Sequence, residues 1–230
     1  QLDAYRAHVF LDFQIVEDDK RSWWKHVNDH LNGRGTTDIH NLRLEFPLRP
    51  VLQPLREIAN AGYFKFLLDQ KPRATGDTPP DFLFTEAENK LKNLIQGASA
   101  LSEISMDLEP ICKHFRKKLN IVFSTQWLDE FSSESRSNPA REITELIHQF
   151  ADPDIWLAQV CWAFLDCLRS ALELDSEAFD QLAREWRLFA VIEGGLWGTG
   201  ALVSSPAEVV RSAAFLLKSD DWFQSANRGG

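Results

Sequence analysis

The spacing of the apolar residues constrains this chain more than any other feature. They recur every three or four positions, as one face of an α-helix requires, along almost all of the 230 residues. In residues 108–119, for example, Ile111, Cys112, Phe115 and Leu119 share a face. The same spacing predicts helices over residues 18–31, 37–46, 54–60, 85–100, 139–150, 155–174, 176–189 and 206–218. We therefore expect an all-α, irregular multi-helix bundle of about nine helices.

Only the N-terminal segment fits a second pattern. Between residues 5 and 16, the apolar Val9, Leu11, Phe13 and Ile15 occupy alternate positions, which is the period of a β-strand. A helical spacing also fits this segment. The prediction is thus all-α with at most one short strand, at the N-terminus.

Capping residues and glycine predict several helix ends. Asn32-Gly33 ends the first helix, because glycine readily adopts the left-handed conformation that closes a helix. Asp152-Pro153 opens the most apolar helix, and Ser176 and Ser205 are expected as the N-caps of the last two.

Three prolines predict a break between residues 46 and 54. Thr36 or Thr37 caps a short helix that ends at Phe46, since Pro47 and Pro50 lack the N–H that a helix interior needs. Pro54 then falls in the first turn of the next helix, where the missing N–H costs little.

Residues 71–81 form the clearest loop, with three prolines and one glycine. The chain is therefore either a single helical domain over residues 1–230 or two subdomains divided by the loop 71–81.

Charge and cysteine content limit the partners and the compartment. Lys and Arg number 25 against 34 Asp and Glu, and this net charge of −9 argues against a nucleic-acid partner, which a concentrated basic face would attract. The three cysteines are an odd number for a disulfide framework, so we expect free buried thiols and a cytoplasmic location. Gln159 and Asp166 interrupt the longest apolar stretch, and no membrane partner is expected.

Two histidine patterns have the spacing of metal ligands. Glu142, Glu145 and His148 contain the Glu-x-x-His element of di-iron bundles, but a second such element is missing. His26 and His30 are four residues apart, with Val27 where a zinc protease carries its glutamate. The prediction is solvated helix faces, with no metal, no cofactor and no catalytic residue.

The glycine-rich segment 194–200 has no Lys or Ser after its last glycine and therefore does not match a phosphate-binding loop. Its glycines predict close helix packing or a helix break, with a hinge as the alternative. The basic cluster of Lys113, Arg116, Lys117 and Lys118 is expected on a solvated face.

Three segments together are similar to a known family. In order they read YRAHVFLDFQIVEDD (residues 5–19), LNGRG (31–35) and LRPVLQPLREIANAGYFKFLLD (48–69). They resemble the helical region that follows the catalytic part of large bacterial α-amylase-family proteins. Residues 156–174 and 207–223 are similar to two further helices there. Gln14 and Leu52 depart from that pattern, which has Arg and His at these positions.

The resemblance implies a non-catalytic accessory domain of an α-glucan-processing enzyme, acting in domain docking, oligomer contact or glucan positioning. Its partner would be an upstream catalytic (β/α)₈ barrel. The chain opens on Gln1, and its only methionine is Met106, which agrees with a piece of a larger protein. The candidate binding residues are Trp23, Trp24, Asn32 and Arg34, which lie in or beside these segments.

Two other functions stay open. A free-standing all-α adaptor that binds a protein partner is favoured by the adjacent aromatic pairs Trp23-Trp24 and Trp222-Phe223. An enzyme or metal protein would use His26, His30 or His148.

Overall fold

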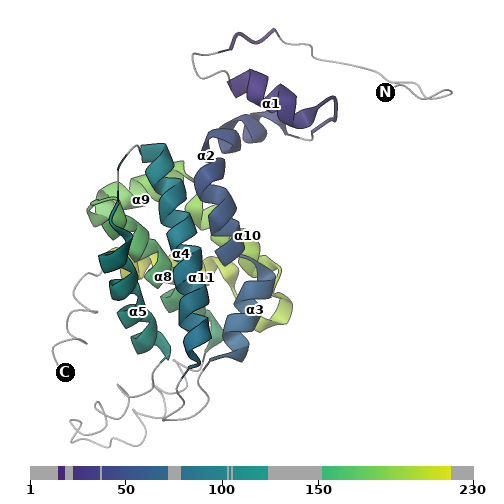
Figure 1. Ribbon diagram of the computed structural model, residues 1–230. Coiled ribbons are helices and arrows are strands. Elements are labelled where there is room, and N and C mark those ends of the chain that lie inside the picture. Colours follow the sequence, from purple (N-terminus) through teal and green to yellow (C-terminus); the bar gives the residue numbers. More distant parts are fainter. Residues whose placement is uncertain are drawn as a thin grey trace, which may run out of the picture. The chain divides into compact units, whose positions relative to one another are not determined.

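The computed structural model describes residues 15–18, 23–36, 38–71, 79–102, 104, 106–123 and 152–218. All regular structure within these ranges is helical, which confirms the all-α prediction (Figure 1). The strand considered for residues 5–16 lies outside the described residues except for Ile15 and Val16, and the helix predicted at 139–150 lies wholly outside them. The α-helices are α1 (Trp23–Leu31), α2 (Ile39–Ile58), α3 (Ala61–Asp69), α4 (Asp81–Ser102), α5 (Leu108–Phe123), α8 (Pro153–Ala171), α9 (Ser176–Glu185), α10 (Leu188–Trp197) and α11 (Pro206–Lys218), and a short 3-10 helix, η1 (Gly200–Leu202), precedes α11.

The chain forms two compact units, residues 1–49 and 50–230. The division falls inside α2, between Arg49 and Pro50. The sequence also allowed a division in the loop 71–81, and the described residues on both sides of that loop belong to the second unit.

Helix α1 of the first unit ends as predicted. Asn32 and Gly33 both have left-handed backbones, with φ of 44° and 76°, directly after Leu31. At the other end, the Asp18 carboxylate accepts hydrogen bonds from the backbone N–H groups of Trp24 and Lys25, at 2.9 and 3.0 Å. A carboxylate at this end also complements the positive end of the helix dipole.

The break predicted in the proline-rich segment is wrong. One helix of 20 residues, α2, contains all three prolines. Each proline removes a donor, so the carbonyls of Arg43, Phe46 and Pro50 lack the N–H group that follows four residues later. Burial of the residues that follow Pro50 in the second unit offsets this loss, which local reasoning about proline does not include.

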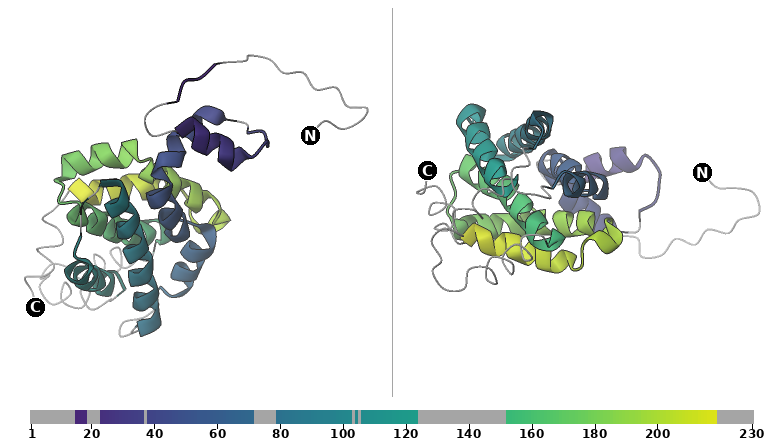
Figure 2. Two further views of the ribbon diagram at one scale, coloured as in Figure 1. Left: turned by 45° about the horizontal axis from the view of Figure 1, so that its top comes forward. Right: turned by 90° about the horizontal axis from the view of Figure 1, so that it is seen from below.

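Helix α8 is the central helix of the second unit. Most of its residues are buried, and it contacts α3, α4, α5 and α11 (Figure 2). Its most extensive contact is with α11. Hydrogen bonds near both ends show that the two helices run in the same direction. At their starts Asp154 accepts hydrogen bonds from the backbone of Ser204 and Ser205, both at 2.9 Å. Near their ends the Ser176 hydroxyl donates to the Leu217 carbonyl at 3.0 Å.

The predicted helix starts near α8, α9 and α11 are partly correct. Asp152 caps α8 and Pro153 is its first residue, as expected. Ser205 accepts a hydrogen bond from Glu208 N–H at the start of α11. Asp175, one residue before the predicted Ser176, caps α9, because its carboxylate accepts from Ala178 N–H.

The single helix expected over residues 176–189 is two helices. Helix α9 ends at Glu185, and Arg187 has a left-handed backbone with φ of 57° before α10 begins. The apolar spacing continues across this turn because both helices face the same core.

Among the described helices, none alone is long and apolar enough to cross a bilayer; α8 and α9 reach that length and composition only as a pair, bent by 106°.

Candidate functional site

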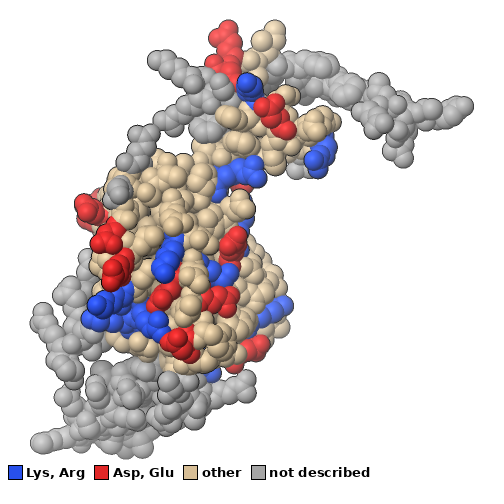
Figure 3. Space-filling model, viewed as in Figure 1, with Lys and Arg blue, Asp and Glu red and all other residues tan. Residues whose placement is uncertain are grey.

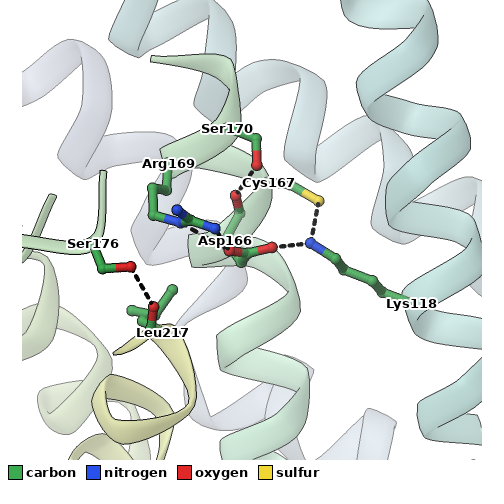
Figure 4. Close-up of polar contacts among 7 residues, drawn as sticks. All are labelled: Lys118, Asp166, Cys167, Arg169, Ser170, Ser176 and Leu217. Carbon is green, nitrogen blue, oxygen red and sulfur yellow. Dashed lines mark hydrogen bonds and ion pairs between the residues drawn. The ribbon is translucent and has the colours of Figure 1, made fainter. Parts of the chain in front are cut away.

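A buried group of charged side chains lies between α5 and α8 of the second unit (Figure 4). Lys118 of α5 is only 1% exposed, and its ammonium forms an ion pair with the Asp166 carboxylate of α8. Arg169, one turn further along α8, donates from Nε and Nη2 to the other carboxylate oxygen at 2.9 and 2.7 Å. Both oxygens of Asp166 are therefore occupied by cationic donors.

The surroundings of this ion pair are apolar and aromatic. The Lys118 Nζ atom lies 5.0 Å from the ring centroid of Trp162, within the range of a cation–π contact. The same atom is 3.9 Å from the Cys167 Sγ atom. The Ser170 hydroxyl donates to the backbone carbonyl of Asp166 at 2.8 Å, one turn earlier in α8.

The electrostatics fix the protonation states of this group. Burial alone would raise the pKa of Asp166, but Lys118 and the hydrogen bonds from Lys118 and Arg169 hold it below its ordinary value. Burial raises the pKa of the Cys161 thiol to about 12, and burial likewise raises that of Cys167 to about 12. The carboxylate is thus ionised and the thiols protonated at neutral pH.

This chemistry fits packing better than catalysis. A protonated, buried thiol is a poor nucleophile, and an ammonium that is paired with a carboxylate has no free electron pair. Buried ion pairs between helices can instead fix which residues face each other. We therefore assign Lys118, Asp166 and Arg169 to the pairing of α5 with α8.

A second constellation lies where α2 ends and α3 begins. The Asn60 side chain accepts from Tyr63 N–H at 2.9 Å and donates to the carbonyls of Arg56 and Glu57 at 3.1 and 2.8 Å. Lys90 of α4 donates to the same Glu57 carbonyl at 3.1 Å. The Asn60 side chain thus caps both the end of α2 and the start of α3.

Two glycines let other helices approach this part of the chain. A Cβ atom at Gly97 of α4 would overlap the carbonyl of Pro50, and one at Gly195 of α10 would overlap the carbonyl of Ala59. Gly194, by contrast, faces open space. The prediction of close helix packing for the glycine-rich segment is confirmed at Gly195.

Tyr63 differs from the polar side chains described above, because its buried hydroxyl has no hydrogen-bond partner among the described residues. Burial, and then the nearby Glu86 carboxylate, raise the pKa of this hydroxyl above its ordinary value. The Lys90 Nζ atom lies over the Tyr63 ring, 4.6 Å from its centroid. The ring therefore serves α3–α4 packing while its hydroxyl adds no bond.

The predicted binding residues lie in the first unit. Trp24 is half-buried, and Asn32 and Arg34 are exposed in the turn after α1. The side chain of Trp23 lies outside the described residues, as do Trp222 and Phe223. Their role in binding stays a prediction.

The histidines of α1 pack against an aromatic ring. His26 stacks on Phe46 with ring centroids 5.6 Å apart, and His30 meets the same ring edge-on at 6.0 Å. Within the described ranges, no group of three or more His, Cys, Asp or Glu side chains has the arrangement of a metal site. Glu142, Glu145 and His148 lie outside those ranges.

Two features were missed from the sequence. Lys118 was expected on a solvated face with its basic neighbours, and this prediction is wrong, because Lys118 faces α8. Its neighbour Arg116 forms ion pairs with Asp81 and Glu88 of α4. Figure 3 shows that positive and negative side chains are intermixed on this face of the second unit. The other feature is Trp197, which is 67% exposed.

The sequence signal for the pairing of Lys118 with Asp166 was the interruption of an apolar helix by Asp166.

The three cysteines are free and buried as predicted.

Comparison with known proteins finds no matching family model, no similar curated protein and no similar solved structure.

Proposed function

We propose that this chain is a non-catalytic helical accessory domain of an α-glucan-processing enzyme of the α-amylase family. It serves domain docking, oligomer contact or glucan positioning for an upstream catalytic domain. The observation that supports this most is the place of residues 48–69, the longest segment of the family resemblance. They form the C-terminal part of α2 and all of α3, and most of their large apolar residues are buried in the core: Val51, Leu52, Leu55, Ile58, Tyr63, Phe64 and Leu67.

A resemblance that rests on core residues is one of architecture and not of a ligand site. The charged group at Lys118 and Asp166 also supports a structural role, because every member is engaged with another. The proposal places the chain in the cytoplasm, where free buried cysteines such as Cys161 and Cys167 persist in the reduced state.

Two arms of one experiment test this proposal. In the first, affinity electrophoresis in a gel containing soluble amylose measures retardation of the wild-type chain and of the variants Trp24→Ala and Arg34→Ala. The exposed Lys25→Ala is the matched control on the same helix. Glucan positioning predicts retardation of the wild type and of the control, and less retardation of the Trp24 and Arg34 variants.

The second arm concerns docking. Lysine cross-linking followed by mass spectrometry of the intact natural protein should connect exposed lysines of this chain, such as Lys25 and Lys65, with a barrel domain. The proposal fails if the chain shows neither glucan retardation nor cross-links to a barrel.

The second candidate is a free-standing all-α adaptor for a protein partner. Trp197 is 67% exposed and Leu202, five residues further along the chain, is 48% exposed. Both favour the adaptor, because exposed tryptophans are common anchors of protein interfaces. A natural polypeptide of about the length of this chain would favour the adaptor over the accessory domain.

A further inference from the structure

We infer that α2 is an articulated connector, in which two half-helices belong to different units and bend relative to each other at residues 46–50. This goes beyond the proposed function and stands whether or not the chain binds a glucan. It rests on three observations: how the C-terminal half is anchored, how the N-terminal half is anchored, and what separates them.

The C-terminal half of α2 is held firmly in the second unit. Val51, Leu52, Leu55 and Ile58 are all buried there. The carbonyls of its last turn accept hydrogen bonds from Asn60 and from Lys90 of α4. This half cannot reorient without exposing four apolar side chains to water.

The anchor begins at Pro50. Its carbonyl lacks an N–H partner within α2, because Pro54 has no N–H. Gly97 of α4 approaches that carbonyl so closely that a Cβ atom would overlap it. Close packing of α4 against Pro50 therefore fixes the start of this half within the second unit.

The N-terminal half of α2 packs within the first unit. The Phe46 ring contacts His26 and His30 of α1, and the Arg49 guanidinium carbon lies 5.3 Å from the same ring centroid. Leu44 and Ile39 are 56% and 40% exposed, in contrast to the buried apolar residues after Pro50. The residues of α2 before Pro50 thus pack within the first unit, and the residues after it pack within the second.

The segment between the two anchors lacks two of its helix hydrogen bonds. Pro47 cannot donate to the Arg43 carbonyl, and Pro50 cannot donate to the Phe46 carbonyl. Sharp bends of helices occur at prolines because these bonds no longer resist opening. Two such positions three residues apart lie at the unit boundary, where Arg49 and Pro50 are both exposed.

Spin-label distance measurements test the connector. Labels are placed at the exposed positions Asn28→Cys in α1 and Ser212→Cys in α11, while the three native cysteines are buried. The articulated helix predicts a broad distance distribution in this labelled chain. It predicts a clearly narrower one after Pro47→Ala and Pro50→Ala together, because alanine restores both hydrogen bonds and favours the helix.

Pro54→Ala is the matched control, since it restores one helix bond inside the anchored half. Its distribution should be as broad as that of the unchanged α2. The inference is overturned if the unchanged chain is already as narrow as the double variant, or if Pro54→Ala narrows the distribution equally. Hydrogen exchange of the unlabelled chain adds a second readout: amides of Leu48 and Arg49 should exchange faster than those of Leu55 and Ile58, and equal protection would also overturn it.

Discussion

Helices α8 and α10 are both strongly apolar, yet they differ in how much of their surface is buried. Most residues of α8 are buried among four neighbouring helices. In α10 only Leu188, Ile192 and Leu196 are buried, along one stripe, and Trp197 is 67% exposed. The only charged residue of α10, Glu193, is partly exposed, whereas α8 carries the buried carboxylate of Asp166. Apolar content alone therefore does not decide burial: α10, which packs against α3, α9 and α11, buries only one stripe of its apolar residues.

The largest effect should come from the buried charge of α8. Replacing Asp166 by Asn keeps the shape but leaves Lys118 and Arg169 without their carboxylate. Removing one partner of a buried ion pair costs about 3–5 kcal/mol, so the free energy of unfolding from urea titration should fall by that amount. A loss of less than about 1 kcal/mol would show that the Lys118 ammonium reaches water, against the burial of its side chain.

The matched control replaces both partners. Lys118→Met with Asp166→Leu fills the space with apolar atoms, and such exchanges are often neutral or stabilising. The double variant should recover most of the stability lost in Asp166→Asn. If the double variant is no more stable than Asp166→Asn, apolar packing does not replace the stability that the ion pair provides.

The same carboxylate predicts how stability depends on pH. Because the folded-state pKa of Asp166 is lowered, its contribution is fully present above the ordinary pKa of an aspartate. That contribution is lost as the pH falls from there through the folded-state pKa. Thermal unfolding followed from neutral pH into the acid range should show a steeper acid loss for the wild type than for the Lys118→Met, Asp166→Leu variant. Equal slopes would contradict the assigned pKa direction.

Two adjacent glycines of α10 provide an intermediate effect with an internal control. A Cβ at Gly195 would overlap the Ala59 carbonyl, so Gly195→Ala should destabilise the chain by about 1–3 kcal/mol. Gly194 faces open space, and Gly194→Ala should stabilise by roughly 0.5–1 kcal/mol through helix propensity. Unfolding in urea measures both. If both variants change the free energy of unfolding in the same direction, the packing of α10 against the end of α2 is contradicted.

The smallest effect should come from the exposed face of α10. Trp197→Ala removes a side chain that is mostly in water, and the free energy of unfolding should change by no more than about 0.5 kcal/mol. Its matched control is Trp156→Ala in α8, where the indole is buried and donates to the Val122 carbonyl at 3.2 Å. That variant should lose about 3–5 kcal/mol. Similar losses for both tryptophans would erase the contrast between the two helices.

Sequence reasoning succeeded where a short stretch decides the structure. Asn32-Gly33 ends α1, Asp152-Pro153 opens α8, and Ser205 caps α11, because capping depends on a few neighbouring residues. Pro47 and Pro50 were misread for the same reason. Their local cost favours a break, and only the burial of the residues that follow shows that the helix continues.

The candidate sites show the same limit. The pairing of Lys118 with Asp166 joins positions 48 residues apart, and helical spacing alone placed Lys118 with its solvated neighbours. The exposure of Trp197 likewise depends on which helices cover α10. The roles of Trp24, Asn32 and Arg34 in binding stay predictions.

The accessory-domain proposal is tested most directly by the length of the natural polypeptide. Sequencing of the complete gene, together with the mass of the natural protein, measures it. The account predicts a polypeptide much longer than 230 residues that contains a (β/α)₈ barrel before this chain. A complete natural polypeptide of about these 230 residues, without a barrel, would contradict it.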